Sequence, residues 1–178
     1  MELTIHRITS NQDPLFDAVW DIYLSSFPLC EQRTPEHQQT ALRSERYHLD
    51  CYLEGEQVVG LLGYWDFPDY LYIEHFAVNP ACRNGGHGGR ILDDLIRRTP
   101  KTVIIEIDPL TDEISRRRHN FYTRHGFVMT DHKHPLHRYQ PHDHEEMDLL
   151  IMSHPEGIDK TTYERFNNDM HNVVMRRD

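Results

Sequence analysis

The chain has 178 residues, which is long enough for one domain with a substantial buried core. Its formal net charge is −10, which disfavours DNA or RNA as a partner, because phosphate neutralisation dominates that kind of binding. The sequence has no apolar run of about 18 residues, and its first ten residues lack the order of a signal peptide. We therefore expect a cytoplasmic protein that binds neither nucleic acid nor a membrane.

The N-terminal part of the chain predicts a strand followed by two helices. Apolar and polar residues alternate over residues 2–8, which is typical of a strand. Asp13 followed by Pro14 marks the start of one helix, and Thr34 followed by Pro35 marks the start of a second.

Three strands are predicted to follow in succession. Two apolar runs, residues 47–54 and 57–66, flank a turn that contains Gly55 and predict a β-hairpin. A third apolar run, residues 70–78, follows the turn "DFPD". Consecutive strands with short turns favour antiparallel pairing.

The second half alternates between helices and strands. The predicted elements are a helix that begins within residues 82–90 and ends before Pro100, a strand over 102–107, a helix capped by Thr111 or Asp112 and stopped by Gly126, strands over 127–130 and 147–153, and a last helix over 159–175. We find no internal repeat and no domain linker. The pattern predicts a single domain with a mixed α/β sheet and a strand–helix–strand crossover in its middle.

Residues 82–90 read "CRNGGHGGR", with four glycines at the expected start of a helix. A helix start exposes unpaired backbone N–H groups and a partial positive charge, and glycines let these groups converge on a phosphate. Two common nucleotide motifs do not fit. A Walker A loop needs Lys and a hydroxyl residue after its last glycine, and the dinucleotide motif would need glycine at Ile91.

A different motif fits this segment. The pattern R-x-x-G-x-G is met by Arg83, Gly86 and Gly88, directly after the strand end "FAVNP". This stretch resembles the signature of the GNAT superfamily of acyl-CoA-dependent N-acyltransferases. Residues 121–127, "FYTRHGF", are similar to a second conserved GNAT segment, and the order of elements over residues 2–153 is also similar to that fold.

The resemblance implies a fold, a reaction and a co-substrate. The expected structure is one GNAT domain over residues 1–178, with its core over about 2–153 and an extra C-terminal helix over 159–175. The implied reaction moves an acetyl group from acetyl-CoA directly to a primary amine on a small molecule or peptide. Homodimers are common in the superfamily, so a homodimer is left open.

The resemblance also implies which residues bind the cofactor. Backbone N–H groups of the glycine loop would hold the CoA pyrophosphate, and the strand before the loop would pair with the pantetheine arm. The cofactor-binding residues implied in this way are Phe76, Ala77, Val78, Arg83, Asn84, Gly85, Gly86, His87, Gly88, Gly89 and Asn120. The alternative reading is a plain glycine-rich turn.

Direct transfer needs a neutral amine, a stabilised oxyanion and a proton for the leaving thiolate. The resemblance assigns the last role to Tyr122, whose phenol is protonated at neutral pH. Glu74 precedes Phe76 by two residues, so strand alternation predicts that both share one face, with His75 on the other. We therefore expect Glu74 to be the general base, and Glu106 on the next strand is the reserve.

Two polar segments border the acceptor side in this reading. Residues 27–36 join the first two helices, so Glu31 and Arg33 could meet the substrate, although both could equally be surface residues. In the loop before the last strand, His137 or Tyr139 could shape substrate choice.

Five histidines gather in a polar stretch between residues 131 and 145. They are His132, His134, His137, His142 and His144. Zinc accepts such ligands, but the stretch contains two prolines and no cysteine, and its spacing matches no common zinc finger. We therefore predict a solvated loop and no metal.

Two other functions remain open at this stage. One is a catalytically degraded GNAT domain that binds CoA and acts as a sensor or partner-binding module. The other is a metal-binding module built on the histidine-rich stretch. Amine acetylation would separate the first from an enzyme, and metal analysis would test the second.

Overall fold

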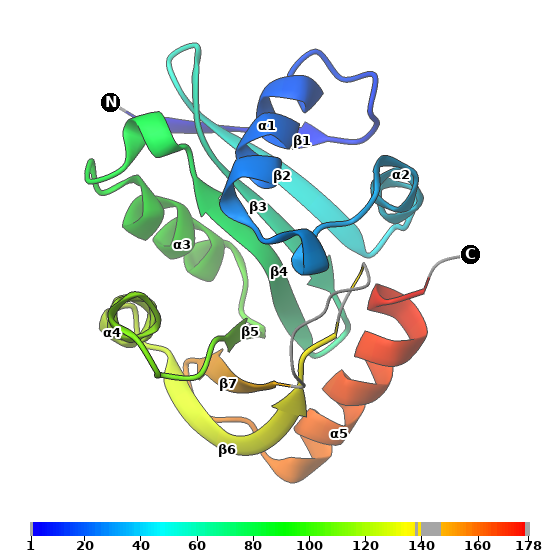
Figure 1. Ribbon diagram of the computed structural model, residues 1–178, viewed down its shortest axis with the longest axis vertical. Helices are drawn as coiled ribbons and strands as arrows, with labels where there is room; N and C mark the ends of the chain where they lie inside the picture. The colour runs from blue at the N-terminus through cyan, green and yellow to red at the C-terminus, as the bar shows by residue number, and fades with distance from the viewer. Residues whose placement is uncertain (1, 138, 140–146, 177–178) are drawn as a thin grey trace.

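The computed structural model describes residues 2–137, 139 and 147–176. Within this range a seven-stranded sheet crosses the molecule in the order β1-β2-β3-β4-β5-β7-β6 (Figure 1). The strands are β1 (Leu3–Ile8), β2 (Tyr47–Glu54), β3 (Gln57–Asp66), β4 (Tyr70–Val78), β5 (Thr102–Ile107), β6 (Val128–Pro135) and β7 (Asp148–His154). Only the β4–β5 pair is parallel, so the expected mixed sheet with one central crossover is confirmed.

Helices cover both faces of this sheet (Figure 1). They are α1 (Phe16–Ser26), α2 (Pro35–Leu42), α3 (His87–Arg98), α4 (Glu113–Arg124) and α5 (Lys160–Asp169), with short 3₁₀ turns η1 (Leu29–Glu31) and η2 (Pro80–Cys82) and a π-helical turn η3 (Met170–Val174). Residues of α1, α2, α5 and η3 form one apolar core with the sheet, and residues of α3 and α4 form the other. No helix in the described range is long and apolar enough to span a bilayer.

The helix starts follow local hydrogen bonding. Thr34 and Asp112 cap α2 and α4 as the sequence predicts, each accepting a backbone N–H with its side chain. In contrast, α1 begins two residues later than expected. The Asp13 side chain accepts from the Leu15 N–H at 2.9 Å and its carbonyl accepts from the Phe16 N–H at 2.9 Å, which forms a separate turn before the helix.

Strand β6 is longer than its predicted four residues. It continues to Pro135, so His132 and His134 lie in the sheet rather than in a solvated loop. The side chain of His134 has no solvent exposure. The polarity of this segment suggests a loop, but burial of His134 among partners from other elements overrides that local signal. His142 and His144 lie outside the described residues.

The sheet opens between its two parallel strands. Residues Tyr70–Ile73 of β4 pair with Thr102–Ile105 of β5, and in the described chain this pairing ends there. Beyond Ile73, β4 continues to Val78 while paired only with β3. One backbone edge of β4 is therefore left without a strand partner, and a pocket lies along it.

Candidate active site

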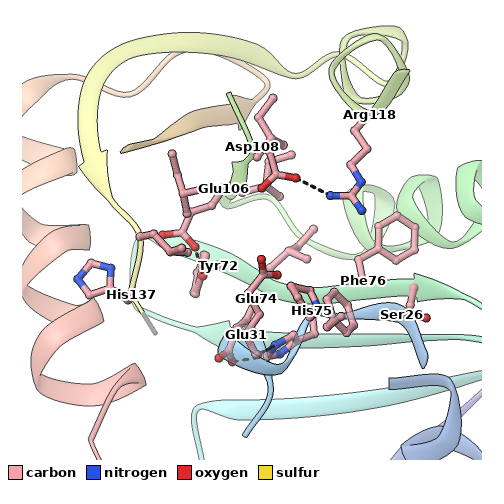
Figure 2. A pocket seen from close by; sticks show the side chains of 18 of the residues that line it. Ser26, Glu31, Tyr72, Glu74, His75, Phe76, Glu106, Asp108, Arg118 and His137 are labelled. Carbon is pink, nitrogen blue, oxygen red and sulfur yellow. Dashed lines mark hydrogen bonds and ion pairs between the residues drawn. The ribbon is translucent and has the colours of Figure 1, made fainter. Parts of the chain in front are cut away.

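A pocket of about 580 Å³ lies where β4 and β5 part, which is within the range of small-molecule sites (Figure 2). Its walls come from β4, β5, α4, the segment after α1 and the residues that follow β6. Of the residues expected at the site, the pocket lining includes Glu74, Phe76, Ala77, Val78, Arg83 and Tyr122. Residues far apart in the sequence thus meet at one cavity.

A β-bulge in β4 changes the faces of its side chains. Gly63 pairs with His75 and Tyr64 pairs with Ile73, so Glu74 is the extra residue. The predicted sharing of one face by Glu74 and Phe76 is therefore wrong. Phe76 packs in the α3–α4 core, whereas Glu74 is held among residues of the other core.

Both carboxylate oxygens of Glu74 are engaged by buried partners. Oε1 forms an ion pair with Arg33 at 2.7 Å, and Oε2 accepts a hydrogen bond from the Trp65 indole N–H at 2.7 Å. The Glu74 side chain is only 3% exposed. Glu74 thus lies at the pocket wall, where the buried Arg33 guanidinium balances its charge and Trp65 donates to its Oε2.

Arg33 serves the core rather than the substrate side. Its guanidinium is buried, lies over the ring of Tyr139 at 4.7 Å from the centroid, and donates to the Tyr139 hydroxyl at 3.2 Å. The ring of Tyr47 is also close, at 5.2 Å. The buried charge is balanced by Glu74 and by these π faces. We conclude that Arg33 fixes the position of Glu74.

Glu31 presents a different kind of carboxyl in the same pocket. It lies in η1, whose position is fixed because the His75 imidazole donates from Nε2 to the Glu31 backbone carbonyl at 3.0 Å. Burial raises the pKa of the Glu31 carboxyl to about 7, and the nearby charge of Asp108 adds to this shift. A carboxyl with such a pKa exchanges protons near neutral pH. The sequence suggested only that Glu31 contacts the substrate. Its raised pKa could not be predicted, because burial of the carboxyl depends on residues that the fold brings around it.

Tyr122 comes from α4 and lines the pocket as expected. Its ring packs edge-on against Phe121 and Phe127, with centroids 5.2 and 5.5 Å apart. Burial raises the pKa of the Tyr122 phenol to about 12. The hydroxyl therefore keeps its proton at neutral pH and can donate it to a developing anion.

The glycine loop leads from β4 into α3. Asn84 and Gly86 take left-handed backbone angles, with φ of 67° and 75°, and the helix follows at once. The first helical hydrogen bond runs from the Arg90 N–H to the Gly86 carbonyl, so the N–H groups of residues 87–89 precede it. This geometry suits an anion at the helix start.

Arg83 and Asn120 differ in how they sit relative to the pocket. Arg83 is exposed, lines the pocket and follows η2 at the loop's entrance. Asn120 is exposed on α4 and is absent from the pocket lining. Two helical positions separate it from Tyr122, which places the two side chains on nearly opposite sides of α4.

The opposite wall carries acidic and imidazole groups whose contacts with one another were not predicted from the sequence. Glu106 on β5 accepts from the Tyr72 hydroxyl at 2.6 Å and contacts His134 of β6. Asp108 forms an ion pair with Arg118 of α4 at 2.7 Å, drawn as a dashed line in Figure 2. These contacts bridge strands and helices that are distant in the chain, so no local pattern could reveal them.

Comparison with known proteins agrees with this architecture. A family model described as "Acetyltransferase (GNAT) family" matches residues 15–127, which is more than half of the chain. The chain belongs to the GNAT acetyltransferase family. The resemblance read from the glycine loop and from the "FYTRHGF" segment is thereby confirmed.

Solved GNAT structures share this fold. A GNAT-family protein of Bacteroides thetaiotaomicron is 28% identical and matches with a TM-score of 0.88, covering 98% of this chain and 99% of that one. A GNAT acetyltransferase of Elizabethkingia anophelis, solved with acetyl-CoA bound, is 19% identical with a TM-score of 0.61, covering 85% and 96%. The mixed α/β GNAT fold is therefore established.

A curated relative matches over a shorter stretch. YjbC of Bacillus subtilis is 28% identical in an alignment of 105 residues, and the match covers 57% of this chain. The match spans about half of YjbC's own length, 52%.

Proposed function

We propose that the protein transfers an acetyl group from acetyl-CoA to a primary amine in the pocket between β4 and β5. The observation that carries the proposal is the convergence of three features on one cavity. An unpaired strand edge, a phenol and a carboxyl of raised pKa all border it, and the glycine loop follows directly from its β4 wall. Family membership and the acetyl-CoA bound in the Elizabethkingia relative support the choice of co-substrate.

Acetyl-CoA would lie along the open edge of β4. The N–H groups at the start of α3, from His87 to Gly89, would bind the pyrophosphate, with Arg83 close by. The backbone of Phe76–Val78 would pair with the pantetheine arm as an added strand. This arrangement would direct the thioester carbonyl into the pocket, toward Tyr122 and Glu31. We keep Asn120 as a proposed cofactor residue on the resemblance alone.

We assign proton removal from the incoming amine to Glu31 rather than to Glu74. An alkyl ammonium must lose a proton before its nitrogen can attack, and Glu31 has a pKa near 7 in the same pocket. The Glu74 carboxylate is already paired with the Arg33 guanidinium, and its Oε2 accepts from Trp65. Glu74 would then have a structural role, in which its contacts with Arg33 and Trp65 hold this part of the pocket wall in place.

The bond changes follow from these roles. Glu31 takes one proton from the ammonium, directly or through water, and passes it to solvent, and the neutral nitrogen then forms a bond to the acetyl carbonyl carbon. The tetrahedral intermediate collapses as the carbon–sulfur bond breaks, Tyr122 donates its proton to the leaving thiolate, and the second proton lost by the nitrogen returns to the Tyr122 phenolate through water. The products are the acetamide and free CoA. The acceptor we favour is a cationic amine, on a small molecule or a peptide, because its ammonium would enter beside Glu31.

A pH profile of the variant Glu31→Gln tests this assignment. With wild-type protein, the rate of thiol release should rise as the pH passes through about 7, because the carboxylate form is the base. Glu31→Gln should lower kcat/KM by roughly 10²–10⁴-fold and remove that rise. The exposed Glu45→Gln variant is the matched control and should keep the wild-type profile. An unchanged profile in Glu31→Gln would refute the role of Glu31.

A further inference from the structure

A cluster of nitrogen and oxygen donors lies beside the pocket, where β5 and β6 meet η3. Its members are Glu106 of β5, His134 of β6 and His137, which follows β6. One donor atom from each residue lies within 4.8 Å of the others. The His134 side chain is fully buried and that of Glu106 is 16% exposed. Glu106 and His137 also line the pocket (Figure 2).

Hydrogen bonding fixes which nitrogen of a neutral His134 carries the proton. The Tyr163 hydroxyl donates its single proton to the Lys133 backbone carbonyl at 2.6 Å. The Tyr163 oxygen must therefore accept from Nδ1–H of His134, at 3.2 Å. This leaves a lone pair on Nε2 of the neutral ring, and Nε2 faces Oε1 of Glu106.

Glu106 brings a second acceptor to the same point. Its Oε2 accepts from the Tyr72 hydroxyl at 2.6 Å, which orients the carboxylate. Its Oε1 lies against Nε2 of His134. A carboxylate oxygen and an imidazole lone pair repel each other unless a cation lies between them, and that cation is either a proton or a metal ion.

The tautomer of His137 is fixed in the same way. The His171 ring donates from Nδ1 to the Asn167 carbonyl at 2.7 Å, so its Nε2 is an acceptor when the ring is neutral. Nε2–H of His137 then donates to Nε2 of His171, at 3.3 Å. Nδ1 of His137 is left with a lone pair. That atom is buried and has no hydrogen-bond partner among the described residues.

We propose that Glu106, His134 and His137 bind a zinc ion. Two imidazole nitrogens and one carboxylate oxygen form a ligand set that zinc uses with a fourth, open position. Each of the three ligands is oriented by a second hydrogen bond, from Tyr72, to Tyr163 or to His171, as metal ligands in proteins usually are. Since Glu106 and His137 line the pocket, the open position faces it.

The donor set selects among cations. Imidazole nitrogens favour zinc and related transition metals, whereas Mg²⁺ and Ca²⁺ prefer sites made of oxygen atoms. The inference stands apart from the proposed acetyl transfer, because binding of the ion is measured without acetyl-CoA or an amine.

Calorimetric titration of the full chain, free of affinity tags, with ZnCl₂ tests the site. We expect one zinc ion per chain with a Kd of about 10 μM or tighter, and no binding of MgCl₂ under the same conditions. His137→Ala and Glu106→Gln should each weaken zinc binding by roughly tenfold or more. A double variant of the two other histidines in this stretch, His142→Asn with His144→Asn, is the matched control and should bind zinc like the wild type.

Melting curves distinguish a variant that has lost zinc binding from one that does not fold. Excess zinc should raise the Tm of the wild type by several degrees and leave the Tm of folded His137→Ala unchanged. The absence of zinc binding to the wild type would overturn the proposal and would identify the cation at Glu106 as a proton. Retention of wild-type affinity in His137→Ala, with loss in the double variant, would also overturn it and would assign the zinc to His142 and His144.

Discussion

Tyr122 is both a packing residue and the acid catalyst that we propose. Its ring contributes to the core between α4 and the sheet, and the residue also lines the pocket. Burial raises its pKa to about 12, so the proton remains on the phenol throughout the neutral range. The sequence pattern around Tyr122 was specific enough to predict its place, because the neighbouring aromatic residues and Gly126 belong to the same segment.

Removal of the Tyr122 hydroxyl should slow acetyl transfer and leave the binding of acetyl-CoA nearly unchanged. Tyr122→Phe should lower kcat by roughly 10–10³-fold, the usual scale for an acid catalyst, because the thiolate must then leave without its proton. The Kd for acetyl-CoA, measured by calorimetry, should stay within about threefold of the wild-type value. An unchanged kcat would rule out the acid role.

Glu31 should make stability depend on pH in a defined direction. Its pKa is raised from 4.5 in the unfolded chain to about 7 in the fold, so the stability it contributes is fully present below pH 4.5. That contribution is lost as the pH rises through about 7, because the unfolded state then releases the proton more readily. Glu31→Gln should therefore be more stable than the wild type at pH 8, by roughly 1–3 kcal/mol in urea unfolding, with a smaller gap at pH 5. A gap that widens toward low pH would contradict the assignment.

The general base could not be predicted from the sequence, which points to Glu74 rather than to Glu31. Strand alternation places Glu74 beside Phe76, but the bulge in β4 breaks that alternation by one residue. The raised pKa of Glu31 arises from burial and from Asp108, which is distant in the sequence. Neither cause leaves a local pattern that could be read from one chain.

At the scale of elements, the ends of most strands could be predicted from turn residues close by in the sequence. β4 and β5 have the predicted bounds, and the hairpin turns at Gly55 with φ of 63°. β6 is one exception, because its polar residues suggested a loop after residue 130. There, contacts of His134 with Glu106 and Tyr163 stabilise an extended strand. Contacts with residues distant in the sequence thus determine where β6 ends.

The start of α3 offers a prediction at this scale. A Cβ at Gly88 would lie 3.3 Å from Cγ2 of Val78 and 3.6 Å from the Phe121 ring, so a larger side chain would crowd the space above the strand. Gly88→Val should weaken acetyl-CoA binding by roughly tenfold or more, because the backbone N–H groups could no longer approach the pyrophosphate.

A glycine far from the loop supplies the control for this measurement. Gly157→Val introduces the same side chain where the nearest atom is a Thr130 methyl at 3.5 Å, and acetyl-CoA affinity should match the wild type. Calorimetry and melting temperatures of both variants separate a binding defect from unfolding. Unaltered affinity in Gly88→Val would mean that the pyrophosphate lies elsewhere.

At the scale of the whole molecule, the C-terminal helix is part of the core. Phe166 of α5 is 1% exposed and packs edge-on against Tyr70 and Tyr72, with ring centroids 6.0 and 5.1 Å apart. The expectation of an added helix was confirmed, but its amphipathic pattern gave no sign of which face of the sheet it covers. In the structure it lies on the face of α1 and α2 (Figure 1), and Met170 and Met175, which follow it, line the pocket.

One measurement tests the central proposal most directly: release of free thiol from acetyl-CoA in the presence of a panel of amines. The panel should include polyamines, aminoglycosides and peptides that carry a free amine. We predict that wild-type protein accelerates thiol release with at least one cationic primary amine, and that mass spectrometry finds the matching acetamide. Binding of acetyl-CoA without acetylation of any amine in the panel would contradict the proposal and would favour a CoA-binding domain without catalytic activity.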